Sequence, residues 1–196
     1  MSDRIATIKR KTLETDILLE LNLDGTGVAE ILTGVGFFDH MLTSLSKHSK
    51  IDISLRCNGD LDVDDHHTVE DCAIALGQAF DKAVGDKRGI VRFGHAYAPL
   101  DEALARAVVD LSGRPNAHIS LLLDDGMIGN LKIENLAHAF ESFAMHAKIT
   151  LHVDVLRGLN SHHKAEAAFK ALALALRAAV MKSDSNDAVP STKGVL

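Results

Sequence analysis

The chain has 196 residues, of which 46% are hydrophobic and 24% charged, and its formal net charge is −6. This length can bury about 70% of the unfolded surface, and the composition excludes a disordered or collagen-like chain. The acidic charge and the few aromatic residues argue against nucleic acid as a partner. No apolar run is long enough for a membrane span. Two cysteines and a charged N-terminus predict a reducing, cytoplasmic location.

The first half of the chain predicts a strand, a helix, a second strand and a second helix. The alternation of Ile17, Leu19, Leu21 and Leu23 is typical of a strand with one buried face. A stretch of helical period then carries His40 and His48. Alternation from Ile51 to Cys57 indicates the next strand, and a helix opens at His66.

The second half predicts a similar succession, with two strands before its first helix. Strands are expected over Ala105–Leu111 and His118–Leu123, separated by a turn at Ser112–Pro115. A helical stretch carries His138 and His146, a strand covers Ile149–Val155, and a helix opens at His162.

This similarity indicates an internal duplication. His66-His67 with Glu70 recurs as His162-His163 with Glu166 at the same spacing, and several apolar positions in the following helices are identical. The predicted fold class is therefore α+β, with two similar β/α halves whose sheets carry helices on one face. We place the halves at residues 1–90 and 91–182, followed by a mobile tail at 183–196 that is expected to become ordered over bound ligand.

The two His-His-x-x-x-Glu units predict metal sites. Residues four apart share a helix face, so His66 with Glu70, and His162 with Glu166, can each chelate one ion. Adjacent helical residues point about 100° apart, so His67 and His163 should serve a different ion.

With His40 and His138, the units supply six imidazoles and two carboxylates, which divide into two sites of three His and one Glu. Four protein ligands leave open positions on a six-coordinate ion, a catalytic arrangement compatible with Mn, Fe, Co, Ni or Zn. Asp64, Asp65 and Asp71 are predicted to accept hydrogen bonds from the ligating imidazoles. The isolated His95, His118 and His152 are interpreted as residues without metal.

Several segments resemble signature segments of the imidazoleglycerol-phosphate dehydratase family. They are Gly36–Leu42, Asp64–Asp71, Asp110–Pro115, Ser161–Glu166 and Pro190–Gly194. The sequence at residues 98–102 is most similar to that of fungal members. The resemblance covers the chain from about Arg10 onward. One departure is Ser44, where we expect Gln in many relatives.

This resemblance implies a lyase of histidine biosynthesis that dehydrates imidazoleglycerol phosphate to imidazoleacetol phosphate. It implies two Mn²⁺ ions per active site, a ring bound as imidazolate between them, and a diazafulvene-like intermediate. It also implies a homo-oligomer, a 24-subunit shell built from trimers, with active sites between subunits.

The resemblance further implies Glu14 as the catalytic base; from the residues alone, Glu14 reads as an exposed strand-edge carboxylate. The positions that the family uses for substrate, its phosphate above all, correspond here to Glu14, His48, Arg92, Arg114, Lys170, Ser191 and Lys193. Two other functions remain open: a noncatalytic metal-storage or metal-sensing protein, and a dinuclear phosphoester hydrolase.

Overall fold

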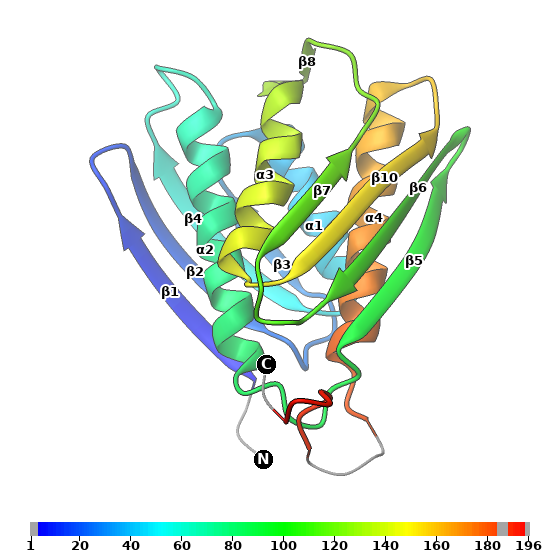
Figure 1. Cartoon of the computed structure of the whole chain (residues 1–196). Coiled ribbons are helices and arrows are strands. Elements are labelled where there is room, and N and C mark those ends of the chain that lie inside the picture. Colours follow the sequence, from blue (N-terminus) through cyan, green and yellow to red (C-terminus); the bar gives the residue numbers. More distant parts are fainter. Residues whose placement is uncertain (1–3, 184–187, 195–196) are drawn as a thin grey trace.

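The computed structural model describes residues 4–183 and 188–194, and the chain forms two halves in succession (Figure 1). The first half contains β1 (Ile5–Lys11), β2 (Thr15–Asn22), β3 (Ala29–Leu32), α1 (Gly36–Ser49), β4 (Asp52–Gly59) and α2 (His66–Val84). The second contains β5 (Phe93–Leu100), β6 (Ala103–Asp110), β7 (Asn116–Ser120), β8 (Met127–Ile128), β9 (Leu131–Lys132), α3 (Ile133–His146), β10 (Thr150–Arg157) and α4 (Ser161–Val180).

The two four-stranded sheets have the same topology. Their strand orders are β1-β2-β4-β3 and β5-β6-β10-β7, and in each sheet two antiparallel pairings are followed by one parallel pairing. The second half differs by the short β8–β9 ribbon, inserted before α3. The predicted α+β fold with two similar halves is confirmed.

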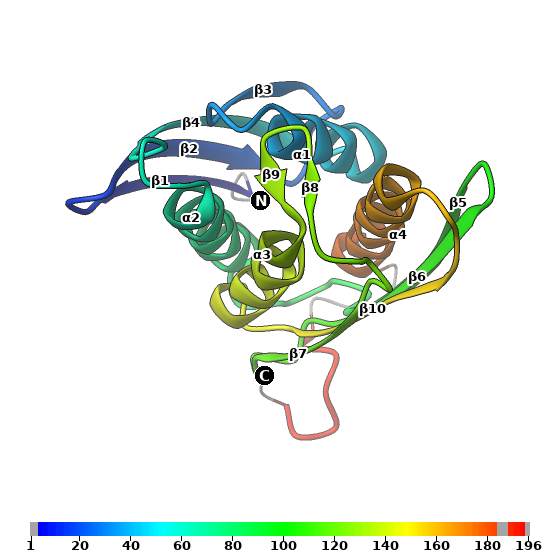
Figure 2. The same cartoon turned by 90° about the horizontal axis from the view of Figure 1, so that it is seen from above.

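The four helices lie between the two sheets, with α1 and α2 against the first sheet and α3 and α4 against the second (Figure 2). Along β2, Ile17, Leu19 and Leu21 face inward and are almost fully buried, while the residues between them are exposed. Helix α2 packs against α3, and α1 against α4, so both halves share one hydrophobic core. Each sheet thus carries helices on its inner face only, which explains the alternating strand pattern.

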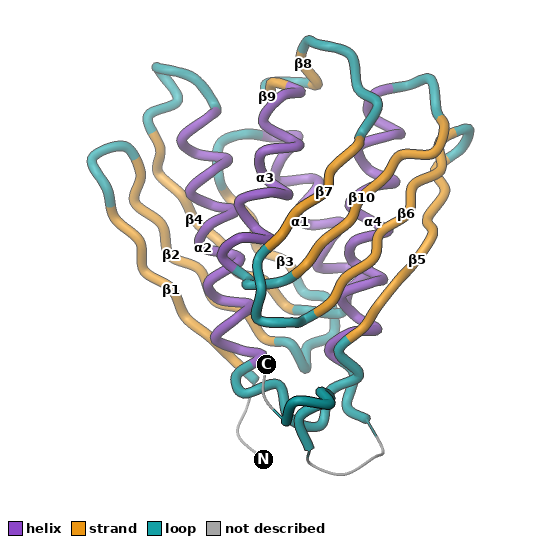
Figure 3. The backbone as a smooth tube through the Cα atoms, viewed as in Figure 1, coloured by secondary structure: helices purple, strands orange, loops and turns teal. Residues whose placement is uncertain are grey.

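One strand ends earlier than its sequence pattern predicts. The strand expected over His118–Leu123 ends at Ser120. Leu122 has a φ of 50°, a left-handed conformation that does not continue a strand. The other predicted strands and helices lie where alternation and helical period place them (Figure 3).

The predicted boundary at residues 90 and 91 falls between α2 and β5, and the division there stays a prediction. In the tail, the carbonyl of Ala188 accepts from the Gly89 amide, and the carbonyl of Pro190 accepts from Arg92 Nη1 at 2.8 Å. Residues 184–187, part of the tail predicted to be mobile, lie outside the described residues. No helix within residues 4–183 and 188–194 has the length and apolarity needed to cross a membrane.

Candidate metal centre

The candidate ligands lie near the N-terminal ends of the four helices. Helices α2, α3 and α4 begin at the same end of the molecule (Figure 1). The start of α1 joins them there, because Asn130 in the β8–β9 turn donates to the carbonyl of Gly34 at 3.0 Å. Side chains in the first two turns of all four helices therefore approach one another.

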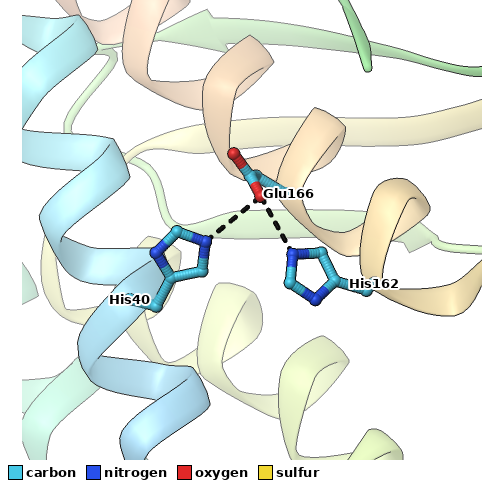
Figure 4. Close-up of side chains that lie close together, drawn as sticks. All are labelled: His40, His162 and Glu166. Atoms are coloured by element: carbon cyan, nitrogen blue, oxygen red, sulfur yellow. Dashed lines mark hydrogen bonds and ion pairs between the residues drawn. The ribbon is translucent and has the colours of Figure 1, made fainter. Parts of the chain in front are cut away.

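The first cluster joins α1 to α4 (Figure 4). His40 Nε2 lies 3.2 Å from Glu166 Oε2, and His162 Nε2 lies 3.1 Å from the same oxygen. Two imidazole nitrogens thus converge on one carboxylate oxygen, as the four-residue spacing predicts for His162 and Glu166.

The second cluster joins α2 to α3, and its two imidazoles approach different oxygens of the carboxylate. His138 Nε2 lies 3.0 Å from Glu70 Oε1, and His66 Nε2 lies 3.8 Å from Glu70 Oε2. The imidazole rings of His66 and His138 are stacked, with centroids 5.0 Å apart.

Both clusters have the donors that a divalent transition metal needs. In each cluster, one ligand atom from every residue lies within 4.8 Å of the others. Two imidazoles and one carboxylate suit Mn, Fe, Co or Zn, and three protein ligands are fewer than a closed site would use. The clusters therefore fit metal ions that keep open coordination positions. Each cluster has two histidines within one chain, whereas the sequence predicts three per site.

The second histidine of each pair points away from its cluster. His67 Nδ1 bonds the Asp60 carboxylate at 3.0 Å, and its Nε2 lies 3.6 Å from Glu14 Oε1. His163 Nδ1 bonds Glu102 Oε2 at 2.7 Å. Within one chain, these two imidazoles lie outside both clusters, as their helical direction predicts.

The acceptors that orient the imidazoles differ from the predicted ones. Asp64 caps the backbone amide of His66, Asp65 accepts from the Lys132 amide, and Asp71 binds Arg10 and Thr15. The prediction that these aspartates hold imidazoles is therefore wrong, because helix capping and ion pairing occupy their carboxylates. The imidazole acceptors are Asp60, Glu102 and Asn135.

The internal repeat offers a signal for one of these missed residues. Glu102 directly precedes β6, as Glu14 directly precedes β2, so the two occupy corresponding turns. Glu102 holds His163, whereas Asp60 holds His67 and leaves Glu14 free of that role. No comparable pattern indicates Asn135.

Hydrogen bonds set the pKa values of these groups. Bonds to Asp60 and to Glu102 raise the pKa values of His67 and His163, respectively. The Asn160 amide, then His163 and the Leu159 amide, lower the pKa of Glu102 to about 2.

Glu166 has a low pKa although it is largely buried. Burial acts to raise this pKa, but bonds from Lys170, His40 and His162 outweigh it and lower the value to about 2. A carboxylate that stays ionised is the form that binds a cation.

Two of the predicted substrate contacts lie near the first cluster. Lys170 Nζ lies 2.8 Å from Glu166 Oε1. Burial and the nearby charge of Lys170 lower the pKa of His48, at the end of α1. Ser44, one turn after His40, is buried, and its hydroxyl has no hydrogen-bond partner among the described residues.

Glu14 lies at the cluster end, beside His67, whereas the other four predicted contacts lie at the opposite end of the molecule. The Arg92 amide donates to the carbonyl of Ala179 in the last turn of α4, whereas His162 lies in its first turn. At 1.5 Å per residue, these points are about 25 Å apart. Arg92 is held by Asp110 at 2.7 Å. Three further predicted contacts lie at this end: Arg114, Ser191 and Lys193.

Comparison with known proteins gives consistent matches. The family model described as imidazoleglycerol-phosphate dehydratase matches residues 33–176. The chain is 55% identical over 195 residues to the imidazoleglycerol-phosphate dehydratase of Salinibacter ruber, covering 100% of this chain and 96% of that protein. It is 59% identical over 193 residues to the protein of that name from Phytophthora nicotianae, but spans only 42% of its length.

Two solved structures are also similar. Imidazoleglycerol-phosphate dehydratase from Staphylococcus aureus superposes with a TM-score of 0.83 at 36% identity, covering 91% of this chain and 99% of that one. The enzyme from Pyrococcus furiosus, in complex with (S)-C348, gives a TM-score of 0.81 at 37% identity, covering 96% and 100%.

Proposed function

Since the chain belongs to the imidazoleglycerol-phosphate dehydratase family, the hydro-lyases of histidine biosynthesis, we propose that it converts D-erythro-imidazoleglycerol phosphate into imidazoleacetol phosphate in the cytoplasm. The observation that carries this proposal is the pair of His₂Glu clusters at one end of the helices, with a half-exposed carboxylate, Glu14, beside His67 at the same end. A storage protein has no need of such a carboxylate.

The ligands of the proposed site are His40, His162 and Glu166 for one ion and His66, Glu70 and His138 for the other. Two Mn²⁺ ions held there would act as Lewis acids that stabilise the substrate ring as an imidazolate, which favours loss of hydroxide through a diazafulvene-like intermediate. Their nitrogen and oxygen donors support this assignment.

His67 and His163 are proposed to complete the clusters of neighbouring subunits. Each points away from its own cluster and is oriented by a carboxylate through Nδ1, so that Nε2 can bind an ion. This arrangement supports a homo-oligomer with active sites between subunits, which we propose to be a 24-subunit shell built from trimers.

Glu14 is the proposed base. Its side chain is 51% exposed in the single chain, and the hydrogen bond that orients His67 goes to Asp60, not to Glu14. It would take the proton from the carbon that becomes the enol carbon; this proton and the hydroxide lost from the carbon next to the ring together make one water. The enol then becomes the ketone of the product.

The positions of the proposed phosphate contacts are a further argument for active sites between subunits. Lys170 lies beside the first cluster, whereas Arg92, Arg114, Ser191 and Lys193 lie about 25 Å away along α4. One small substrate cannot reach both ends of a single chain. It can reach both sets where two chains meet, with His48 near Lys170 lining the same site.

The test is an assay of the purified protein with imidazoleglycerol phosphate, after chelation and after addition of Mn²⁺. The expected result is Mn²⁺-dependent formation of imidazoleacetol phosphate without release of inorganic phosphate. Phosphate release would favour a dinuclear phosphoester hydrolase instead. Mn²⁺ binding with no turnover of any kind would favour metal storage or sensing.

A further inference from the structure

The two clusters correspond through the duplication, yet their surroundings differ. Each contains a His and a Glu four residues apart on one helix and a third residue, a His, from a helix of the other half. The corresponding pairs are His66 and His162, Glu70 and Glu166, and His138 and His40. The donor types are the same in the two clusters, so the residues around them are the place to look for a difference in metal binding.

The first difference is the charge beside the carboxylate. In α4, Lys170 follows Glu166 by four residues, and its ammonium lies 2.8 Å from the carboxylate. The residue at the same offset from Glu70 in α2 is Ile74. Among the described residues, Glu70 makes ion pairs with His66 and His138 only.

The second difference is the group that faces the helical histidine. His66 Nδ1 lies 2.9 Å from Oδ1 of Asn135, a residue that is only 2% exposed. Asn135 precedes His138 by three residues, and the residue at that offset from His40 is Phe37. Phe37 packs against the His162 ring at 5.0 Å in a T-shaped arrangement, and its ring has no lone pair for an imidazole N–H.

Both differences act in the same direction. An acceptor at Nδ1 fixes the tautomer that leaves Nε2 free, and it raises the basicity of the imidazole; loss of such partners costs 10–100-fold in metal affinity. A cation in contact with a carboxylate repels a divalent ion and competes for the same oxygens. The His66 cluster has the acceptor without the cation, and the His162 cluster has the cation without the acceptor.

We propose that the two clusters bind their ions with unequal affinity: the cluster of His66, Glu70 and His138 holds a tight ion, and the cluster of His40, His162 and Glu166 holds a weaker, exchangeable one. Asn135 acts as a positioning residue for the His66 cluster, and Lys170 weakens ion binding at the His162 cluster. The inference deepens the proposed function and rests on its assignment of the clusters to divalent metal.

The experiment is a calorimetric titration of the metal-free, full-length protein with Mn²⁺, at fixed protein concentration. The wild type should bind two ions per chain with dissociation constants at least about tenfold apart. Asn135→Leu should weaken the tight phase by about 10–100-fold and leave the other unchanged. Lys170→Met should tighten the weak phase and narrow the gap, whereas Arg177→Met, an exposed cation further along α4, should change neither.

Two ions that bind wild type with equal affinity would overturn this inference and leave the proposed metal sites standing. Absence of Mn²⁺ binding would overturn both. A ratio of affinities that neither Asn135→Leu nor Lys170→Met changes would also refute the assignment. Because Asn135 is buried, melting of the chelated variant checks its fold, and the partly exposed Lys170 provides an independent test.

Discussion

Replacing Gly77 with Ala should push α2 and α3 apart and lower the Mn²⁺ affinity of the cluster formed by His66, Glu70 and His138. A Cβ at Gly77 would lie 2.6 Å from the carbonyl oxygen of Phe143, 2.8 Å from the amide nitrogen of Ala147 and 2.9 Å from Cβ of His146. The first atom belongs to the backbone of α3 and the second to the backbone of its C-cap residue, so no side-chain rotation relieves the overlap. The same two helices carry Glu70 and His138, whose ligand atoms are 3.0 Å apart.

The expected magnitude follows from two opposing effects. Ala is favoured over Gly inside a helix by about 1 kcal/mol. Overpacking costs about 1–3 kcal/mol, and backbone contacts this short favour the upper part of that range. The free energy of unfolding should therefore fall by about 1–2 kcal/mol, which corresponds to roughly 2–8 °C in Tm at this chain length.

The assay is thermal unfolding of the metal-free protein at matched concentration, followed by Mn²⁺ titration. Gly36→Ala is the control, because its nearest neighbour to a new Cβ is a side-chain oxygen at 3.8 Å and its φ is not positive. That variant should unfold at or slightly above the wild-type temperature. If Gly77→Ala matched Gly36→Ala in Tm and in metal affinity, the reasoning from the helix crossing would be refuted.

Further outcomes are expected. Glu14→Gln should lower kcat by at least about 100-fold with unchanged Mn²⁺ content. The control Glu20→Gln, at an exposed position on β2, should retain full activity. If the two variants were equally active, Glu14 would not be the base. The pKa of Glu102 is lowered to about 2, so its contribution to the free energy of unfolding is present above about pH 4.5 and is lost as the pH falls toward 2. In Glu102→Gln, the free energy of unfolding of the metal-free protein should therefore depend less on pH in that range. Chelation, or His67→Ala, should reduce the assembly on a sizing column, and an unchanged elution volume would contradict the shared sites. Deletion of the residues after Pro190 should raise KM and lower kcat with metal content unchanged, and unaltered kinetics would show an inert terminus.

The sequence predicted the four helices and the central strands because the duplication doubles each signal, but it did not predict the edge strands β1, β3 and β5. Alternation in Ile17–Leu23 and Ile149–Val155 predicts inward faces that are buried in β2 and β10. The end of β7 was missed, since the left-handed φ of Leu122 is a property of the loop that leads to β8. No residue type in residues 121–123 predicts that the strand ends at Ser120.

The site was predictable where helical geometry alone determines it. Four-residue spacing brings His162 to Glu166, but nothing local predicts that Asn135 of α3 faces His66 of α2, because that contact depends on how two helices pack. The aspartates beside His66 were misassigned for the same reason: their position in sequence is close, yet capping at the start of α2 directs Asp64 to the backbone.

Each cluster crosses the boundary between the repeats. His40 comes from the first repeat and meets Glu166 of the second, while His138 of the second meets Glu70 of the first. A half-length ancestor of this chain would have held no complete cluster alone, and two copies related by a twofold axis would have formed two identical ones. In a single chain each cluster can change separately, and one now has a lysine beside its carboxylate and the other an asparagine beside its histidine.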